Sequence, residues 1–194
     1  MRMTRQKTSR CASIAFASAC LALAAACGGN PPPASSTTVE PAAAAFVASF
    51  YEWFAKPKTA GGGDLDWERV LQERPRSLDA PLLAALREDR AAAARNPGEL
   101  VGLEFVPFTA NQDPCEEYET GDATIVADRV RVPVFSVCNG RRLDAPSVSA
   151  EVAKREGEWV FTNVIFGDGD DLLAMLKRQS EERAKPMTKS LPTA

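Results

Sequence analysis

The chain has 194 residues, of which 23 are Lys or Arg, 26 are Asp or Glu and none is His, for a formal charge of −3. Without histidine there is no Ser-His-Asp or Cys-His catalysis, no histidine general base and no histidine-containing zinc site. We expect no nucleic-acid binding either, because that affinity comes from Lys and Arg that neutralise phosphates, and this acidic chain has no basic stripe.

Residues 1–26 have the order of a secretory signal peptide. Basic residues come first, an apolar run from Ile14 to Ala26 follows, and no acidic residue occurs before Glu40. A basic segment, an apolar segment and small residues at a cleavage site are typical of exported proteins. The apolar run is too short and too rich in alanine to cross about 30 Å of hydrocarbon as a membrane helix.

The segment Leu23–Cys27 resembles the lipobox of bacterial lipoproteins, whose cysteine is diacylated and becomes the new N-terminus. We predict that Cys27 is lipidated and attaches the chain to a lipid bilayer. Two alternatives stay open. An ordinary signal peptide could be cleaved after or near Ala26, with Cys27 incidental, or lipidation could occur at Cys20, which would leave a very short apolar segment.

Residues 27–40 are small, polar and rich in proline, as expected of a flexible or extended tether. Gly28 rather than an aspartate follows Cys27, which resembles the sorting pattern of Gram-negative outer-membrane lipoproteins and predicts an outer-membrane location facing the periplasm. Residues 41–184 then form one domain, and residues 185–194 a disordered tail. Without the four basic residues of the signal peptide, 19 remain against 26 acidic residues, a formal charge of −7.

The first half of the domain is predicted to be helical. A helix that begins near Pro41 and stops at Lys56-Pro57 has an apolar face with three- and four-residue spacing, made of Phe46, Val47, Phe50, Tyr51 and Phe54. A short helix follows and ends at Pro75. The next helix begins after the N-cap Asp79 and ends at Asn96-Pro97-Gly98.

The second half is predicted to be an antiparallel meander. Alternating apolar residues predict strands around residues 130–134, 148–152 and 159–166, with turns at Asn139-Gly140 and Glu156-Gly157-Glu158. A short helix with Leu172, Leu173 and Leu176 closes the chain. The fold class is therefore α+β, with N-terminal helices packed on a curved antiparallel sheet and a short C-terminal helix.

Three segments carry a resemblance to a known family: Phe50–Phe54 in the first helix, Asn111–Pro114 at a turn and Glu158–Phe161 in the last strand. With them, residues 42–167 resemble exported bacterial members of the nuclear-transport-factor-two-like (cystatin-like) superfamily, and more narrowly one of its families of unknown function. The resemblance implies a cone-shaped sheet whose open end can hold an apolar ligand. Enzymes of the superfamily, such as ketosteroid isomerase and scytalone dehydratase, place Asp, His or Tyr there.

The candidate pocket residues in this sequence are Tyr51, Asp113, Tyr118 and Trp159. A buried aspartate can act as a base when desolvation raises its pKa. The alternative is structural, with Tyr51 in the core and Asp113 setting a turn before Pro114. We assign no catalytic residue.

Beyond the predicted signal peptide and Cys27, the chain contains two cysteines, Cys115 and Cys138. Two cysteines in one exported domain are expected to pair. Loop-closure entropy gives such a disulfide a stabilisation of roughly 3 kcal/mol. The alternative is two buried free thiols, since the further ligands of a zinc site are not evident.

Two acidic runs invite other chemistry. The run Asp168-Gly169-Asp170-Asp171 lacks the ligand spacing and distal glutamate of an EF-hand, so we expect it to cap the closing helix rather than to bind calcium. The other run is expected to be a solvated face, with docking of a basic partner as the alternative; its members are Glu116, Glu117, Glu119 and Asp122. We predict no metal site and no cofactor.

These features favour a membrane-tethered, non-enzymatic binding or protein-interaction module whose partner is a periplasmic protein or a small apolar ligand. The alternative is a small-molecule enzyme or carrier that uses the cone through Asp113 and a tyrosine. The two differ in the cone itself. An enzyme needs a cavity with a few convergent polar groups, whereas a binding module can have its cone filled by Phe46, Phe50, Phe54 and Trp159.

Overall fold

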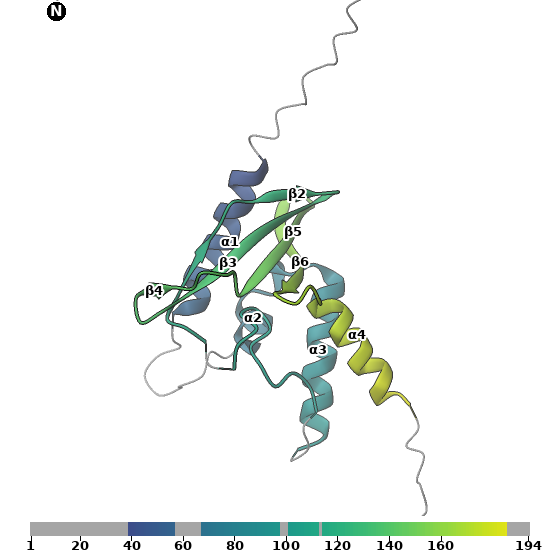
Figure 1. Ribbon diagram of the computed structural model, residues 1–194. Coiled ribbons are helices and arrows are strands. Elements are labelled where there is room, and N and C mark those ends of the chain that lie inside the picture. The colour runs from purple at the N-terminus through teal and green to yellow at the C-terminus, as the bar shows by residue number, and fades with distance from the viewer. Residues whose placement is uncertain (1–38, 57–66, 98–100, 113, 186–194) are drawn as a thin grey trace, which may run out of the picture. The chain divides into compact units, whose positions relative to one another are not determined.

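The computed structural model describes residues 39–56, 67–97, 101–112 and 114–185, which belong to one compact unit, residues 35–194 (Figure 1). The predicted signal peptide, Cys27, Gly61–Gly63, Asp113 and the tail from residue 186 lie outside the described residues. Within the described ranges, no helix is both long enough and apolar enough to span a membrane.

The helices begin and end where caps and prolines predict. The described ranges contain α1 (Val39–Ala55), α2 (Glu68–Glu73), the 3₁₀ turn η1 (Pro75–Ser77), α3 (Ala80–Arg95) and α4 (Leu172–Arg183). The Asp79 carboxylate caps α3 by accepting the Leu82 N–H at 3.2 Å. The Asp171 carboxylate caps α4 in the same way, accepting the Ala174 N–H at 2.8 Å. Each cap satisfies a backbone donor that the helix itself leaves unpaired.

The strands form one six-stranded antiparallel sheet, curved and unclosed, in the order β1-β3-β5-β6. Its members are β1 (Glu117–Thr120), β2 (Thr124–Val126), β3 (Arg129–Cys138), β4 (Arg141–Arg142), β5 (Val148–Arg155) and β6 (Glu158–Phe166). The long strand β3 is central, with β1 and β2 along one side and β4 and β5 along the other.

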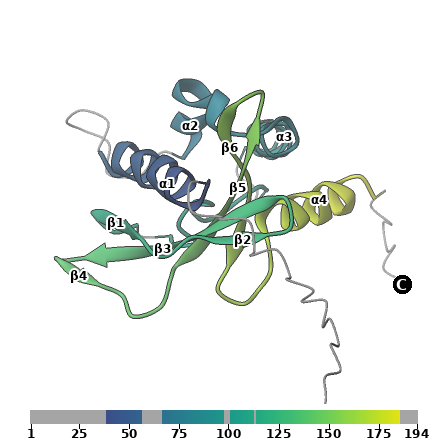
Figure 2. The ribbon, with the colours of Figure 1, turned by 90° about the horizontal axis from the view of Figure 1, so that it is seen from above.

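The helices cover one face and one edge of this sheet. Helix α1 lies across the inner face and contacts β1, β3 and β5, whereas α3 and α4 pack against each other and against β6 (Figures 1 and 2). The segment after η1 protects the β6 edge, because the Asp79 N–H donates to the Phe161 carbonyl at 2.9 Å. An unprotected edge strand would be a site for pairing with another chain.

The core lies between α1 and the sheet. Along β3, the buried Val130, Val132 and Val134 alternate with residues on the opposite face, as the two-residue period of a strand requires. Phe50 is the centre of an aromatic cluster, with ring centroids 4.5 Å from Phe161 and 5.4 Å from Phe108. Aromatic rings of this size contribute a large share of a core's buried area.

The predicted α+β class is confirmed, including the helix caps at Asp79 and Asp171. Strands β1 and β2 were not predicted, because their residues are polar or exposed. The turn at Asn139-Gly140 forms, with φ values of 53° and 70°, but it leads into the two-residue strand β4 and not directly into β5. Positive φ at both positions is the signature of the tight hairpin turns that Asn-Gly favours.

Candidate functional site

The interior of the predicted cone is occupied by the chain's own side chains. Tyr51 is 1% exposed, and its hydroxyl donates to the Phe108 carbonyl at 2.6 Å. Phe54 stacks on Phe50 with centroids 5.8 Å apart, and Phe46 approaches Phe161 to 5.5 Å. These buried side chains fill the space between α1 and the inner face of the sheet.

Tyr118, on β1, packs its ring 5.3 Å from that of Tyr51, so the structure brings these two predicted residues together. The Tyr118 hydroxyl oxygen is buried beside the Thr109 side chain and the Cys115 backbone, whose hydrogen bonds oppose the effect of burial on its pKa. Burial raises the pKa of Tyr118 to about 12 and raises the pKa of Tyr51 further still, because the phenolate loses its hydration. Both side chains are therefore neutral at physiological pH.

The other two predicted pocket residues do not join this pair. Asp113 lies outside the described residues. Trp159 lies at the far end of the sheet, because it pairs with Lys154 at the β5–β6 turn, whereas Tyr118 pairs with Ser136 near the other end of β3. The four candidates therefore do not converge on one pocket in the described part of the chain.

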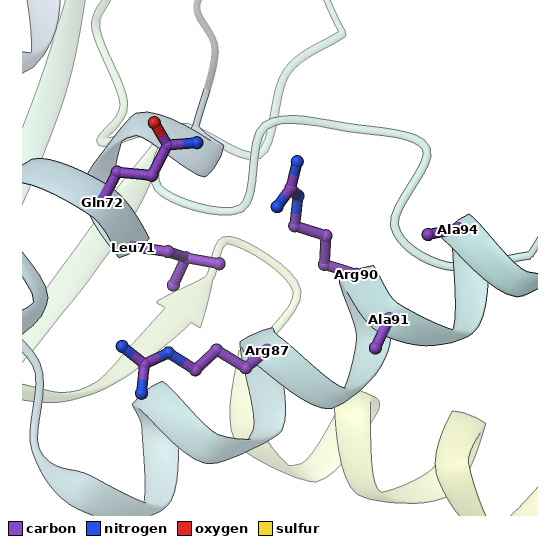
Figure 3. A pocket seen from close by; sticks show the side chains of 6 residues that line it. All are labelled: Leu71, Gln72, Arg87, Arg90, Ala91 and Ala94. Atoms are coloured by element: carbon purple, nitrogen blue, oxygen red, sulfur yellow. The ribbon is translucent and has the colours of Figure 1, made fainter.

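An open pocket of about 320 Å³ lies between α2 and α3 instead (Figure 3). Its apolar floor is built from Leu71 of α2 and from Ala91 and Ala94 of α3, whose small side chains leave space between the helices. Arg87 and Arg90 reach from α3 toward α2 on either side of Leu71. The volume is within the range of small-molecule sites, which combine an apolar lining with a few polar groups.

The two arginines of this pocket have different surroundings. They are three residues apart and therefore share one face of α3. Arg90 forms an ion pair with Glu68 of α2, which holds its side chain over the pocket. Arg87 is exposed and forms no hydrogen bond or ion pair with any other residue that the structure describes. Its guanidinium is thus available to an anionic ligand, which arginine binds through paired N–H donors.

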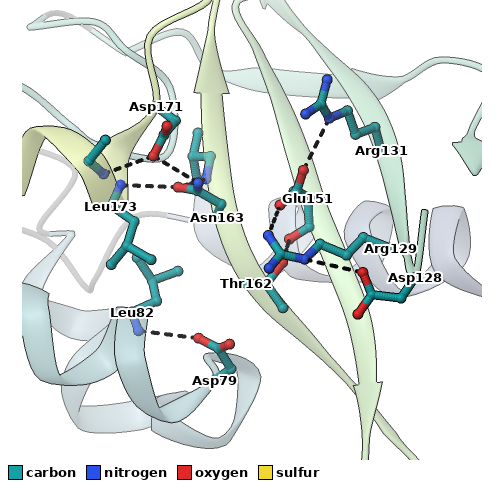
Figure 4. A network of polar contacts seen from close by, with 12 residues as sticks. Asp79, Leu82, Asp128, Arg129, Arg131, Glu151, Thr162, Asn163, Asp171 and Leu173 are labelled. Carbon is teal, nitrogen blue, oxygen red and sulfur yellow. Dashed lines mark hydrogen bonds and ion pairs between the residues drawn. The ribbon is translucent and has the colours of Figure 1, made fainter. Parts of the chain in front are cut away.

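The outer face of the sheet carries a buried carboxylate (Figure 4). Glu151 of β5 is 4% exposed and accepts hydrogen bonds from Arg129 and from Arg131, the latter at 3.1 Å. The pairing raises the pKa of Arg129 through its hydrogen bond to Glu151. Both oxygens of the carboxylate are occupied, so this cluster joins β3 to β5 and leaves no reactive group open.

The cysteine pair and the first acidic run lie together. Cys115 and Cys138 are bonded, with Cα atoms 4.8 Å apart, and so join the segment just before β1 to the end of β3. Glu116 accepts the Asn139 N–H at 3.1 Å, and its own backbone N–H and that of Asn139 lower the pKa of its carboxyl group. Glu119 forms an exposed ion pair with Arg142. This run is a solvated face, as predicted.

The second acidic run caps α4. Asp168 accepts the Asp170 N–H at 3.0 Å, and Asp171 accepts both the Ala174 N–H and the Asn163 amide at 2.8 Å (Figure 4). The hydrogen bond from Arg178 lowers the pKa of Asp170. In the described ranges, no three Cys, Asp or Glu side chains gather as metal ligands would.

Sequence reasoning missed the pocket between α2 and α3. Two arginines three residues apart, followed by alanines on the same helix face, were the available signal, but such a pattern is also that of an ordinary solvated helix. No protein-family model matches this chain, and no curated protein and no solved structure matches it. What the chain does is therefore inferred from its residues and their geometry.

Proposed function

We propose that this chain is an exported lipoprotein, anchored through acylated Cys27 to the periplasmic side of the outer membrane, whose domain is a non-enzymatic binding module of the nuclear-transport-factor-two-like (cystatin-like) type. The anchor is supported by the basic and apolar segments before Cys27 and by the lipobox-like residues 23–27. The family is supported by an aromatic helix, α1, packed on a curved antiparallel sheet.

The filled cone is the observation that favours binding over catalysis. Its tyrosines have raised pKa values and are held by Phe108 and by each other, so neither is poised as a base. A catalytic site of this family would need convergent polar groups facing a cavity. The open pocket between α2 and α3 offers two arginines and no carboxylate among its lining residues, a set that binds charge without a group to transfer protons.

The chemistry of this pocket specifies its ligand. The exposed guanidinium of Arg87 favours a phosphate or carboxylate group, while Arg90 is paired with Glu68. The floor of Leu71, Ala91 and Ala94 favours an apolar portion beside the anion. We therefore propose a small anionic ligand with a short apolar part. The chain has a net negative charge, so the exposed Arg87 is a local positive charge on an acidic protein.

Calorimetry with the purified exported chain tests this proposal. Three probes are compared. Inorganic phosphate presents the charge alone, 1-hexanol presents the apolar part alone, and hexyl phosphate presents both. We expect hexyl phosphate to bind more tightly than either fragment. Arg87→Gln should weaken its binding about tenfold, equivalent to about 1.4 kcal/mol for one lost charge-assisted contact.

The matched control is Arg76→Gln, which removes an exposed arginine outside the pocket. It should leave the affinity for hexyl phosphate unchanged. Urea unfolding of both variants checks that the fold is intact. Equal affinity of the wild type and Arg87→Gln, or no binding of hexyl phosphate at all, would contradict a ligand site between α2 and α3.

A further inference from the structure

Two exposed apolar side chains lie at one end of the sheet. Among the described residues, the exposed large hydrophobic side chains are Ile125 (45% exposed), Val126 (38%) and Leu143 (43%). Ile125 lines a shallow hollow of about 230 Å³ together with Trp159 and Lys154. Val126, the next residue of β2, lies on the opposite face of the sheet at the same end. We call Ile125, Val126, Lys154 and Trp159 the tether end.

The tether end lies where α1 begins. Phe46, near the start of α1, packs on Phe161 of β6. Phe161 lies in one cross-strand row with Val152 of β5, Val130 of β3 and Ile125 of β2. Tyr51, further along α1, packs instead on Tyr118 toward the other end of the sheet. Figure 1 shows the first turn of α1 and strand β2 at the same end of the domain.

The chain that leads to the proposed anchor leaves from this same end. Eleven residues, 28–38, separate Cys27 from the first residue of α1. Even fully extended, they span at most about 40 Å. If Cys27 is acylated, the anchor is therefore joined to the domain at the end that carries the exposed Ile125 and Val126.

The composition of the tether end suits a bilayer interface. Tryptophan is enriched at the headgroup level, where its ring is partly apolar and its N–H remains hydrated. The Lys154 ammonium lies 5.5 Å from the Trp159 ring, so its stem extends along apolar surface. Charges around the two hairpin turns balance, since Arg129, Lys154 and Arg155 are matched by Asp128, Glu156 and Glu158. Apolar burial, and not charge, would hold this surface to lipid.

We propose that the tether end rests on the bilayer to which Cys27 attaches the chain. This inference depends on the proposed lipid anchor, and it adds an orientation to it. Arg69 of α2 binds the carbonyls of Trp53 and Lys56 at the far end of α1, so α2 lies away from the tether end. With the tether end on the membrane, the pocket between α2 and α3 stays open to the periplasm.

Quenching of tryptophan by brominated lipid tests this orientation. The lipidated chain is reconstituted into phosphatidylcholine vesicles with or without bromine on the acyl chains. The chain has three tryptophans, so wild type is compared with Trp159→Phe and Trp67→Phe. We expect quenching in wild type and in Trp67→Phe, and its loss in Trp159→Phe. Because charge is balanced, quenching should persist at high salt.

A matched pair of surface variants tests the apolar contact. Ile125→Asp combined with Val126→Asp should abolish quenching of Trp159. Leu143→Asp places one carboxylate on a similarly exposed apolar residue in the loop after β4, and it should leave quenching unchanged. Unchanged quenching in the double variant would overturn the proposal.

Membrane fractionation distinguishes the proposed lipid anchor from the proposed orientation. Retention of Cys27→Ser in the membrane fraction after a carbonate wash would overturn the anchor, and the orientation with it. Cys27-dependent attachment without Trp159 quenching would overturn the orientation alone. A photo-cross-linker at position 125 should capture lipid. Capture of one discrete protein in its place would assign the tether end to a protein partner and overturn contact with the bilayer.

Discussion

The ring of Tyr118 lies 5.3 Å from the ring of Tyr51, centroid to centroid, and these are the two tyrosines of the chain. One joins α1 to the Phe108 carbonyl, and the other belongs to the edge strand β1. Both pKa values are raised by burial, that of Tyr118 to about 12, so the pair reports on packing of the cone interior.

Absorbance at 295 nm, which measures tyrosinate, should therefore stay flat in the folded chain through pH 10. In urea, both tyrosines should ionise near the ordinary value of about 10. Only the unfolded chain releases these protons near pH 10. The free energy of unfolding therefore keeps its full value below pH 10 and decreases above it. The decrease is at most about 1.4 kcal/mol per pH unit for the fully buried Tyr51. Tyrosinate that forms at pH 10 in the folded chain would mean an open, hydrated cone.

Glu151 depends on two arginines for compensation of its buried charge. Replacing both, in Arg129→Gln with Arg131→Gln, should lower the free energy of unfolding by about 2 kcal/mol, because the buried carboxylate loses both of the positive charges that compensate it. Adding Glu151→Gln to that variant should restore part of the loss. Urea unfolding measures all three, with the exposed Arg155→Gln as a neutral control. A triple variant less stable than the double would contradict this.

The Cys115–Cys138 disulfide closes a loop with a sequence separation of 23. Replacing both cysteines with serine should lower the free energy of unfolding by about 3 kcal/mol, from loop-closure entropy in the unfolded chain. The test is urea unfolding of wild type with and without reductant, beside the double variant. Wild type with reductant should match the variant. Equal stability under all conditions would mean that the bond is not formed in the exported protein.

Asp89 joins α3 to α4 from a fully buried position. It accepts the Leu103 N–H and the Arg183 guanidinium, each at 2.9 Å. Arg183→Gln should cost about 1–3 kcal/mol, because the Asp89 carboxylate loses its charged partner. In Arg183→Gln, the exchange of backbone amide hydrogens with solvent should become faster in α4 than in wild type, and should change less in α1.

Glu88 provides the control for this contact. It pairs with the same arginine from a side chain that is 43% exposed, and exposed pairs contribute only about 0–1 kcal/mol. Glu88→Gln should therefore change stability and exchange in α4 very little. Equal effects of Glu88→Gln and Arg183→Gln would contradict a special role for the buried Asp89.

Local signals predicted much of this fold. The cap at Asp79, the cap at Asp171 and the positive-φ turn at Glu156-Gly157 depend on neighbouring residues alone, so the sequence reveals them. The alternation of buried valines also predicts β3 from the sequence. Any strand with one buried face has an apolar residue at every second position, whatever packs against that face.

The short strands and the pocket required tertiary information. Strand β1 is Glu-Tyr-Glu-Thr, and β2 is a three-residue strand, Thr-Ile-Val, so neither is long enough or regular enough to show the alternating pattern of a strand. Both form by pairing with β3. The separation of Trp159 from Tyr118 follows from sheet register, which no local pattern specifies. The pocket around Arg87 exists only because α2 packs beside small residues of α3.

The central claim is that an acyl chain on Cys27 holds a binding domain at a membrane, and the mass of the mature N-terminal peptide tests it most directly. The protein is purified from the membrane fraction of its bacterial host and digested, and its first peptide is sequenced by mass spectrometry. We predict a peptide that begins at Cys27 and carries a diacylglyceryl group. A first peptide that starts elsewhere, or one that begins at Cys27 with an unmodified thiol, would contradict the anchor.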